Sequence, residues 1–317
     1  MQPHLITHDI SAQHAVPDGH PECPERYGVI LDALPDLAHD WIKCEAPLAT
    51  MDQLALAHNP DYINMVYDTV AQSDDLVPFD PDTWSSKYGL ECAARAVGGA
   101  CLAVDMVVGG EASTAFSLMR PPGHHAEPDR AMGFCLFSSA AIAARHAQEK
   151  WGLKTIAVVD FDVHHGNGTQ ACFWDDASLI YASSHQMPLF PGTGAVAETG
   201  AHNNIFNMPF YDGASGTEII KGWTNELLPA IEAASPDLII ISAGFDAHKL
   251  DPLAGLGMET EDFGILTAHI IITAAAHIAQ TNKTAHVISL LEGGYNLNVL
   301  GASVVSHMNA LAQISNL

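Results

Sequence analysis

The run Thr155-Ile-Ala-Val-Val-Asp-Phe-Asp-Val-His-His-Gly-Asn-Gly168 places a short apolar stretch directly before a cluster of Asp, His and Asn residues. The apolar part is continuous and rich in β-branched residues, which is typical of a strand buried on both faces of a parallel sheet. We therefore predict a strand over Thr155–Phe161 that delivers polar side chains at its carboxyl end.

Runs of the same character recur along the chain, and segments of helical spacing separate them. The other predicted strands are Thr114–Met119, Leu179–Ser183, Ile205–Met208, Leu238–Ser242 and His286–Leu291. The predicted helices are Tyr88–Val108, Ser138–Lys150, Gly216–Ala234 and Glu261–Thr281. This alternation predicts an α/β fold with three α/β/α layers around a central, mainly parallel sheet. No linker or repeat divides the sequence, so we expect a single domain over residues 1–317.

Polar clusters follow five of the predicted strands: Pro121–Glu127, Asp162–Gly168, His185–Gly194, Gly244–Leu250 and Glu292–Asn296. In open parallel sheets, ligands bind at the carboxyl ends of the strands. We therefore expect the five loops to meet in one crevice.

The chain is strongly acidic, with 37 Asp and Glu against 12 Lys and Arg, a formal net charge of −25. This charge repels phosphate backbones, which argues against nucleic-acid binding. It favours a cationic substrate such as a lysine-rich peptide or a polyamine, although on charge alone a general solubility role is the simpler explanation. The six cysteines form no CxxC pair, which predicts reduced thiols. No signal peptide and no apolar stretch of about 18 residues is visible, which predicts a cytoplasmic protein without membrane insertion. The sequence leaves open whether the protein forms a homo-oligomer.

Asp162 and His164 are the first candidate metal ligands: if the strand continues, residues i and i+2 point to the same side, so both side chains can reach one metal ion. Asp246, just past another predicted strand, is the best candidate for the third ligand. Two carboxylates and one imidazole leave an open coordination position, as a catalytic zinc ion requires, although Fe²⁺ or Mn²⁺ also suits this set. An isolated Asp-x-His triplet is more often a structural pair than a metal site.

His124 and His125 follow the rigid turn Pro121-Pro-Gly123, which can present both imidazoles to a crevice. One imidazole can accept a proton from water, and the other can stabilise developing charge. Asp160 and Asn167 are candidates to orient one imidazole each. Tyr295 follows two glycines and can donate to an oxyanion, while Phe134 and Phe190 are either channel walls or ordinary core residues.

Ordered along the whole chain, these motifs resemble the zinc-dependent histone deacetylases and acetylpolyamine amidohydrolases, which share the arginase–deacetylase fold. The matching segments are His20-Pro-Glu22, Arg120–Glu127, Gly133-Phe-Cys135, Asp160–Gln170, Phe190–Gly194, Ala243–Asp246, Asp251-Pro-Leu253 and Leu291–Asn296. Asn167, where other members carry Asp, and the ending Leu291-Glu-Gly-Gly-Tyr-Asn296 resemble the class II branch.

The resemblance implies a role for each matching residue. It implies one zinc ion held by Asp162, His164 and Asp246. It implies that His125, partnered by Asn167, is the general base and then the acid, that His124, partnered by Asp160, acts electrostatically, and that Tyr295 polarises the amide carbonyl. Gly133, Phe134 and Phe190 would line the acyl-lysine tunnel, with Leu253 at its wall, Asp82 at the rim and Arg26 near an inner cavity. A structural potassium ion is also implied, near Asp160, Asp162, His164, Ser183 and Ser184.

The expected function is zinc-dependent removal of acetyl or other short acyl groups from lysine side chains in peptides or proteins. An acetylpolyamine deacetylase is the first alternative, because Pro21-Glu-Cys23 resembles a motif of polyamine-selective members and the charge suits a polycation. Against it, Leu253 stands where those members carry an acidic residue. A catalytically silent acyl-group binding protein is the second alternative. An arginase-like ureohydrolase needs carboxylates for two manganese ions, and position 166, where one is expected, is Gly.

Overall fold

The apolar runs form one sheet. In the computed structural model, which describes residues 1–36, 41–281 and 286–316, its strands are β1 (His4–Thr7), β2 (Ile42–Glu45), β5 (Ala115–Leu118), β6 (Ile156–Asp160), β7 (Leu179–Gln186), β8 (Ile205–Phe210), β9 (Leu238–Ala243) and β10 (His286–Leu291). Their order is β2-β1-β5-β10-β9-β6-β7-β8, and every neighbouring pair is parallel. A small antiparallel pair, β3 (Val77–Pro78) and β4 (Trp84–Ser85), is separate from this sheet.

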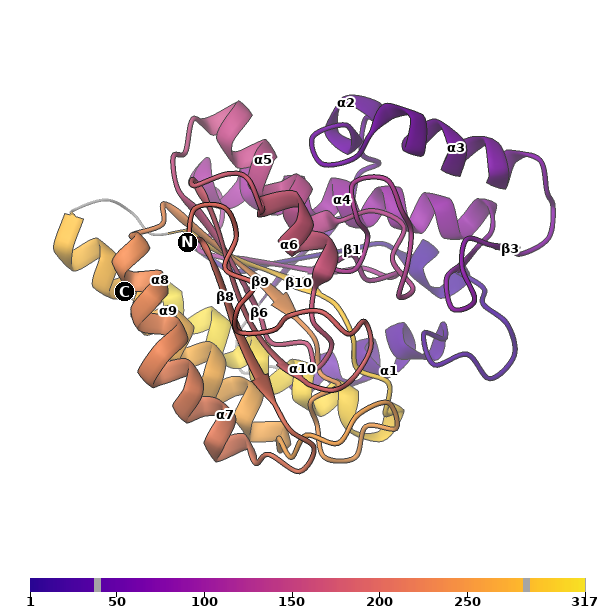
Figure 1. Ribbon diagram of the computed structural model, residues 1–317. Helices are drawn as coiled ribbons and strands as arrows, with labels where there is room; N and C mark the ends of the chain where they lie inside the picture. Colours follow the sequence, from indigo (N-terminus) through magenta and orange to yellow (C-terminus); the bar gives the residue numbers. More distant parts are fainter. Residues whose placement is uncertain (37–40, 282–285, 317) are drawn as a thin grey trace.

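Helices cover both faces of the sheet (Figure 1). They are α1 (Glu25–Ala33), α2 (Met51–Leu54), α3 (Pro60–Ala71), α4 (Lys87–Val108), α5 (Ser139–Trp151), α6 (Asn167–Phe173), α7 (Gly216–Gly222), α8 (Leu228–Ala234), α9 (Thr260–Thr281) and α10 (Leu297–Leu311). Short 3₁₀ turns occupy Asp9–Gln13, Leu34–Asp36 and Ala312–Asn316. The predicted three-layer α/β/α fold with a mainly parallel sheet is confirmed.

Strand β6 shows how the alternation of side chains divides the core. Ala157 and Val159, together with Phe161 directly after the strand, pack with α1 and α7–α10 on one face. Ile156 and Val158 pack with α4, α5 and α6 on the other face. Because both faces of the strand are covered, the run is apolar throughout, which is the pattern that predicted the strand.

The predicted helix Gly216–Ala234 is interrupted in the structure. Pro229 has no backbone N–H and its ring crowds the carbonyl four residues earlier, so it cannot continue a regular helix. The chain instead widens into a π-helical turn at Trp223–Leu227 before α8 begins. Ser215 and Glu218 form a capping box at the start of α7.

The strands β1 and β2 are absent from the predictions. Each has four residues of which only two are apolar, too few for a recognisable apolar run. Strand β2 lies at the sheet edge with mostly exposed side chains, and charged Lys43 and Glu45 are typical of an edge strand that avoids further pairing. Across the described ranges, no helix combines the length and apolar character needed to cross a bilayer.

Candidate active site

Four adjacent strands supply the side chains of the site. They are β5, β10, β9 and β6, neighbours in the sheet although β10 is the last strand in the sequence. His124 and His125 follow β5, Tyr295 follows β10, Asp246 follows β9, and Asp162 and His164 follow β6. Parallel strands end at one edge, so four segments distant in sequence meet there.

Asp162, His164 and Asp246 are buried and form a candidate metal site, with one ligand atom of each within 4.8 Å of the others. His164 Nδ1 lies 3.2 Å from Asp162 Oδ1 and 3.1 Å from Asp246 Oδ2. Strand β6 ends at Asp160, so the condition that the strand continues through Asp162 and His164 is not met. They lie in the turn after it, where Asp162 Oδ1 accepts a hydrogen bond from the His164 backbone N–H at 2.9 Å.

Backbone groups hold both carboxylates in place. The Gly293 N–H donates to Asp162 Oδ2 at 2.7 Å, and the Val163 N–H donates to Asp246 Oδ1 at 2.9 Å. A Cβ atom at Gly244 would clash with the Asp162 carboxylate, and one at Gly293 would clash with that of Asp246. These contacts fix the positions of Asp162, His164 and Asp246, the metal trio.

The trio fits a divalent cation. Burial alone would lower the pKa of His164, but its hydrogen bonds to Asp162 and Asp246 outweigh burial and raise this pKa to about 10. Two buried carboxylates around one imidazole concentrate negative charge that a cation can neutralise. The mixed oxygen and nitrogen donor set, with three protein ligands, suits a catalytic zinc ion.

The side chains of the tandem histidines His124 and His125 have different hydrogen-bond partners. Their ring centroids are 4.0 Å apart. His124 Nδ1 lies 3.0 Å from Asp160 Oδ2, whereas His125 Nδ1 lies 2.8 Å from the neutral Asn167 Oδ1. Both predicted partner pairs are therefore present as contacts.

The pKa values of the two rings move in opposite directions. Burial alone would lower the pKa of His124, but the charges of Asp162, Asp160 and Glu292 together raise it well above its usual value. Burial, followed by the charge of His124, lowers the pKa of His125 well below its usual value. His124 is thus cationic and His125 neutral near pH 7, which suits His125 for accepting a proton.

Tyr295 is held by a buried arginine. Arg26 lies over its ring, with 4.8 Å from Cζ to the ring centroid, and donates hydrogen bonds to the Gly294 and Glu292 carbonyls at 2.7 and 2.6 Å. Burial raises the pKa of the Tyr295 phenol well above 10, although Arg26 opposes this shift. The phenol therefore stays protonated and can donate a hydrogen bond.

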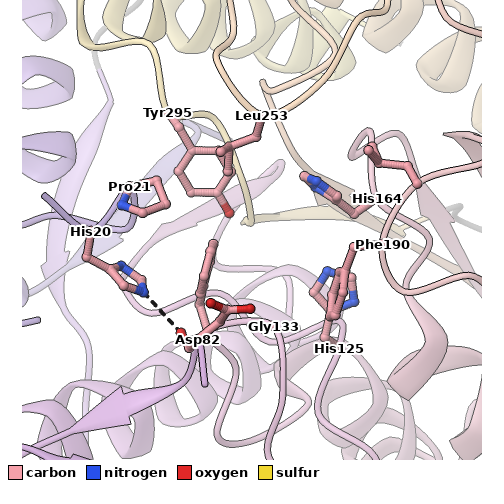
Figure 2. A pocket seen from close by; sticks show the side chains of 11 residues that line it. His20, Pro21, Asp82, His125, Gly133, His164, Phe190, Leu253 and Tyr295 are labelled. Atoms are coloured by element: carbon pink, nitrogen blue, oxygen red, sulfur yellow. Dashed lines mark hydrogen bonds between the residues drawn. The ribbon is translucent and has the colours of Figure 1, made fainter. Parts of the chain in front are cut away.

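A cavity of about 400 Å³ opens onto these groups. It is lined by His20, Pro21, Asp82, His125, Gly133, Phe134, His164, Leu189, Phe190, Leu253 and Tyr295. In Figure 2 the Tyr295 hydroxyl points into the middle of the cavity, with His125 and His164 on one side and His20 on the other. Gly133 adopts a left-handed φ of 56° and packs against the His125 ring, where a Cβ would lie 2.7 Å from Cγ.

The structure brings the predicted site residues together. Those predicted for the tunnel, including Asp82, line the cavity, while Asp160, Asp162, Asn167 and Asp246 are buried and do not line it. No structural role was predicted from the sequence for four charged residues around the site, Glu22, Arg120, Glu127 and Glu292, although Glu22 belongs to the Pro21-Glu-Cys23 motif. Arg120 pairs with Glu22 through two hydrogen bonds of 2.7 Å, and both are fully buried. Charged residues are usually exposed, so only their place inside these motifs could have signalled a buried role.

Comparisons with known proteins agree with this geometry. The histone deacetylase domain model matches residues 20–311. "Histone deacetylase 10, chloroplastic" of Oryza sativa is 35% identical over 313 residues, covering 92% of this chain and 70% of the relative. "Polyamine deacetylase HDAC10" of Mus musculus is 34% identical, covering 92% of this chain and 44% of the relative. The crystal structure of the HDA15 HD domain superposes with a TM-score of 0.90 and 31% identity, covering 98% of this chain and 88% of that one.

Proposed function

The chain belongs to the histone deacetylase family, and on that premise we propose that it is a zinc-dependent amidohydrolase that removes acetyl or other short acyl groups from lysine side chains in peptides or proteins. The main support for this function is that His164 of the metal trio, His125 and Tyr295 all line one cavity of about 400 Å³. We also propose that residues 1–317 form one catalytic domain, because one sheet carries the segments of the metal trio, His125 and Tyr295.

Asp162, His164 and Asp246 would hold the zinc ion. When bound, zinc supplies Lewis acidity that polarises a carbonyl and makes a coordinated water more acidic. Fe²⁺ is the alternative occupant for the same donor set. A structural potassium ion near Asp160, Asp162, His164, Ser183 and Ser184 is part of the proposal, supported by the burial of all five residues.

The protein's own groups perform the proton transfers. Neutral His125 accepts a proton from the attacking water and later returns it to the departing amine. The Tyr295 hydroxyl donates a hydrogen bond to the carbonyl oxygen as negative charge develops there. Cationic His124, held by Asp160, stabilises the same charge electrostatically.

The cavity walls support a lysine-type substrate. Phe134, Phe190 and Leu253 offer apolar surface to the methylenes of an acylated lysine. The acidic Asp82 at the wall and the net charge of −25 favour a cationic substrate, and they also support the second candidate, an acetylated polyamine.

The testing experiment compares hydrolysis of an acetyl-lysine peptide and N-acetylated polyamines by the zinc-loaded protein. Selective peptide turnover that is lost in His125→Ala, and kept in the matched control His202→Ala at an exposed histidine, would support lysine deacylation. Preference for the polyamines would favour the second candidate. If zinc binds but neither substrate turns over, whether it carries an acetyl or another short acyl group, the proposed activity is wrong, and a silent acyl-group binding protein would then be tested by peptide binding.

A further inference from the structure

The Asn167 side chain lies between His125 and the carboxylate of Glu127, a residue that has no part in the proposed proton transfers. Its Oδ1 lies 2.8 Å from His125 Nδ1, and its Nδ2 donates to Glu127 Oε1 at 2.7 Å. Asn167 is 5% exposed, so water competes little for either end of the amide.

Within the part of the chain that the structure describes, the hydrogen-bond neighbours of Asn167 Nδ2 are all acceptors. Besides Glu127 Oε1, these are the His125 carbonyl oxygen and the Met132 sulfur, each at 3.3 Å. If the amide were rotated by half a turn, its oxygen would face three acceptors. The charged Glu127 contact is the shortest of the three and contributes the most to holding the amide in its present orientation.

The orientation of the amide decides which His125 nitrogen carries the proton. An oxygen facing Nδ1 requires a hydrogen on Nδ1, and a neutral ring then has its lone pair on Nε2. A rotated amide would donate to Nδ1 and place the hydrogen on Nε2, which could not then accept a proton.

Glu127 is itself held in place. Its Oε2 accepts a hydrogen bond from Arg130 at 2.9 Å, its backbone N–H donates to the Arg130 carbonyl at 2.9 Å, and its carbonyl accepts from His58 at 3.0 Å. Its side chain is 25% exposed, so it remains accessible to solvent on one side.

We propose that Glu127 is a positioning residue that acts through Asn167 to keep His125 in the tautomer with the proton on Nδ1. This deepens the proposed function and rests on it for the activity readout, whereas the tautomer itself can be measured without any substrate. His125, Asn167 and Glu127 thus form a chain in which the carboxylate acts one amide away from the ring.

A double-mutant cycle on the zinc-loaded protein tests the proposal. Glu127→Ala should lower kcat by about 10–100-fold, with little change in KM, as for loss of an outer partner of a working histidine. Asn167→Asp should also lower kcat, because it places two carboxylates in contact. Combining Asn167→Asp with Glu127→Ala removes the contact between the two carboxylates, and the Asp at 167 accepts from His125 Nδ1–H without help. The kcat of this double variant should recover to within about threefold of the wild-type value. Two sites that act independently would not show this coupling.

The proposal would be overturned if the change at Glu127 lowered kcat by the same factor in wild type and in Asn167→Asp. A residue that only stabilises the turn would have the same effect on kcat in both proteins. Glu218→Gln is the matched control, since glutamine can keep the capping box of α7. Its kcat should equal that of wild type.

Nitrogen NMR of ¹⁵N-histidine-labelled, zinc-loaded protein supplies the readout besides activity. The His125 signals, identified by their loss in His125→Ala, should show Nδ1–H in wild type and a shift toward Nε2–H in Glu127→Ala. An unchanged tautomer in Glu127→Ala would overturn the inference even if the enzyme is active. Conversely, a shifted tautomer in a protein that hydrolyses neither substrate would support the inference while the proposed function fails.

Discussion

The Glu292 carboxylate accepts a hydrogen bond from the backbone N–H of Gly123 at 2.7 Å, across 169 positions of sequence. The same oxygen accepts from the His124 N–H at 3.1 Å, and the other oxygen accepts from the Ser242 hydroxyl at 3.1 Å. One buried carboxylate therefore joins the ends of β5, β9 and β10. Burial raises the pKa of Glu292 to about 7, although the charge of His124 opposes this shift.

Glu292→Ala should destabilise the turn that presents His124 and His125. It leaves two buried N–H groups without their acceptor, at a cost of about 1–3 kcal/mol each. Urea unfolding should report the loss, and kcat should fall with it. Glu292→Gln keeps one acceptor oxygen and should be closer to wild type. Equal stability and activity of Glu292→Ala and wild type would contradict this role.

Tyr295→Phe should lower kcat by about 10²–10³-fold, as for loss of one oxyanion donor, with little change in stability. The matched control is Tyr211→Phe, which removes the same hydroxyl from a side chain that is 79% exposed. Steady-state kinetics on the preferred substrate would measure both. Full activity in Tyr295→Phe would show that the phenol is not an oxyanion donor.

Zinc should bind with one catalytic ion per chain and raise the thermal midpoint, because a ligand that binds only the folded state stabilises by about 2.7 kcal/mol at 100 times its Kd. Asp246→Ala should abolish this gain, and Asp175→Ala, at an exposed site, should keep it. Metal analysis with calorimetry checks the prediction. Two tightly bound transition metals per chain would favour a ureohydrolase-like site instead.

Gly133→Ala should lower kcat through His125. The new Cβ would lie 2.7 Å from His125 Cγ, so the ring must move. Gly152→Ala tests the backbone effect alone, because its φ of 68° is similar and no atom lies within 4 Å of its Cβ position. Both variants should lose stability, since a left-handed φ is unfavourable for alanine, but only Gly133→Ala should lose most of its kcat.

The folded protein should lose stability as the pH falls below about 6.5, because burial lowers the pKa of His307 to about 3. The unfolded chain then binds a proton that the folded chain does not, so stability from this group is complete above pH 6.5 and declines below it. In His307→Gln, the free energy of unfolding should change less with pH, by about 1.4 kcal/mol between about pH 7.5 and 5.5. Urea titrations at both pH values measure this. The same slope in both proteins would contradict the assignment.

Local pattern was enough to place Asp162, His164 and Asp246 near one another. Each follows an apolar run, and parallel strands end at the same edge of a sheet. A continuing strand is nevertheless not what brings Asp162 and His164 together, because the strand stops at Asp160 and a turn positions both side chains. Where a short strand ends depends on its neighbours as well as on its own residues.

The buried charges could not be assigned from the sequence. Glu22 and Arg120 lie 98 positions apart and are each other's partners inside the protein. A charged residue belongs on the surface unless a partner is available, and the partner is a property of the folded chain. Glu127 likewise gains its importance from Asn167, which lies 40 positions later in the sequence at the start of α6.

The sequence by itself determined which segments become strands, which polar groups follow them, and which family they resemble, because these depend on side-chain period and on residues adjacent in the chain. Only the tertiary structure decided that β10 inserts between β5 and β9, placing Tyr295 and Glu292 between the histidine turn and Asp246. That order results from long-range packing of helices on both faces of the sheet, which no local period encodes.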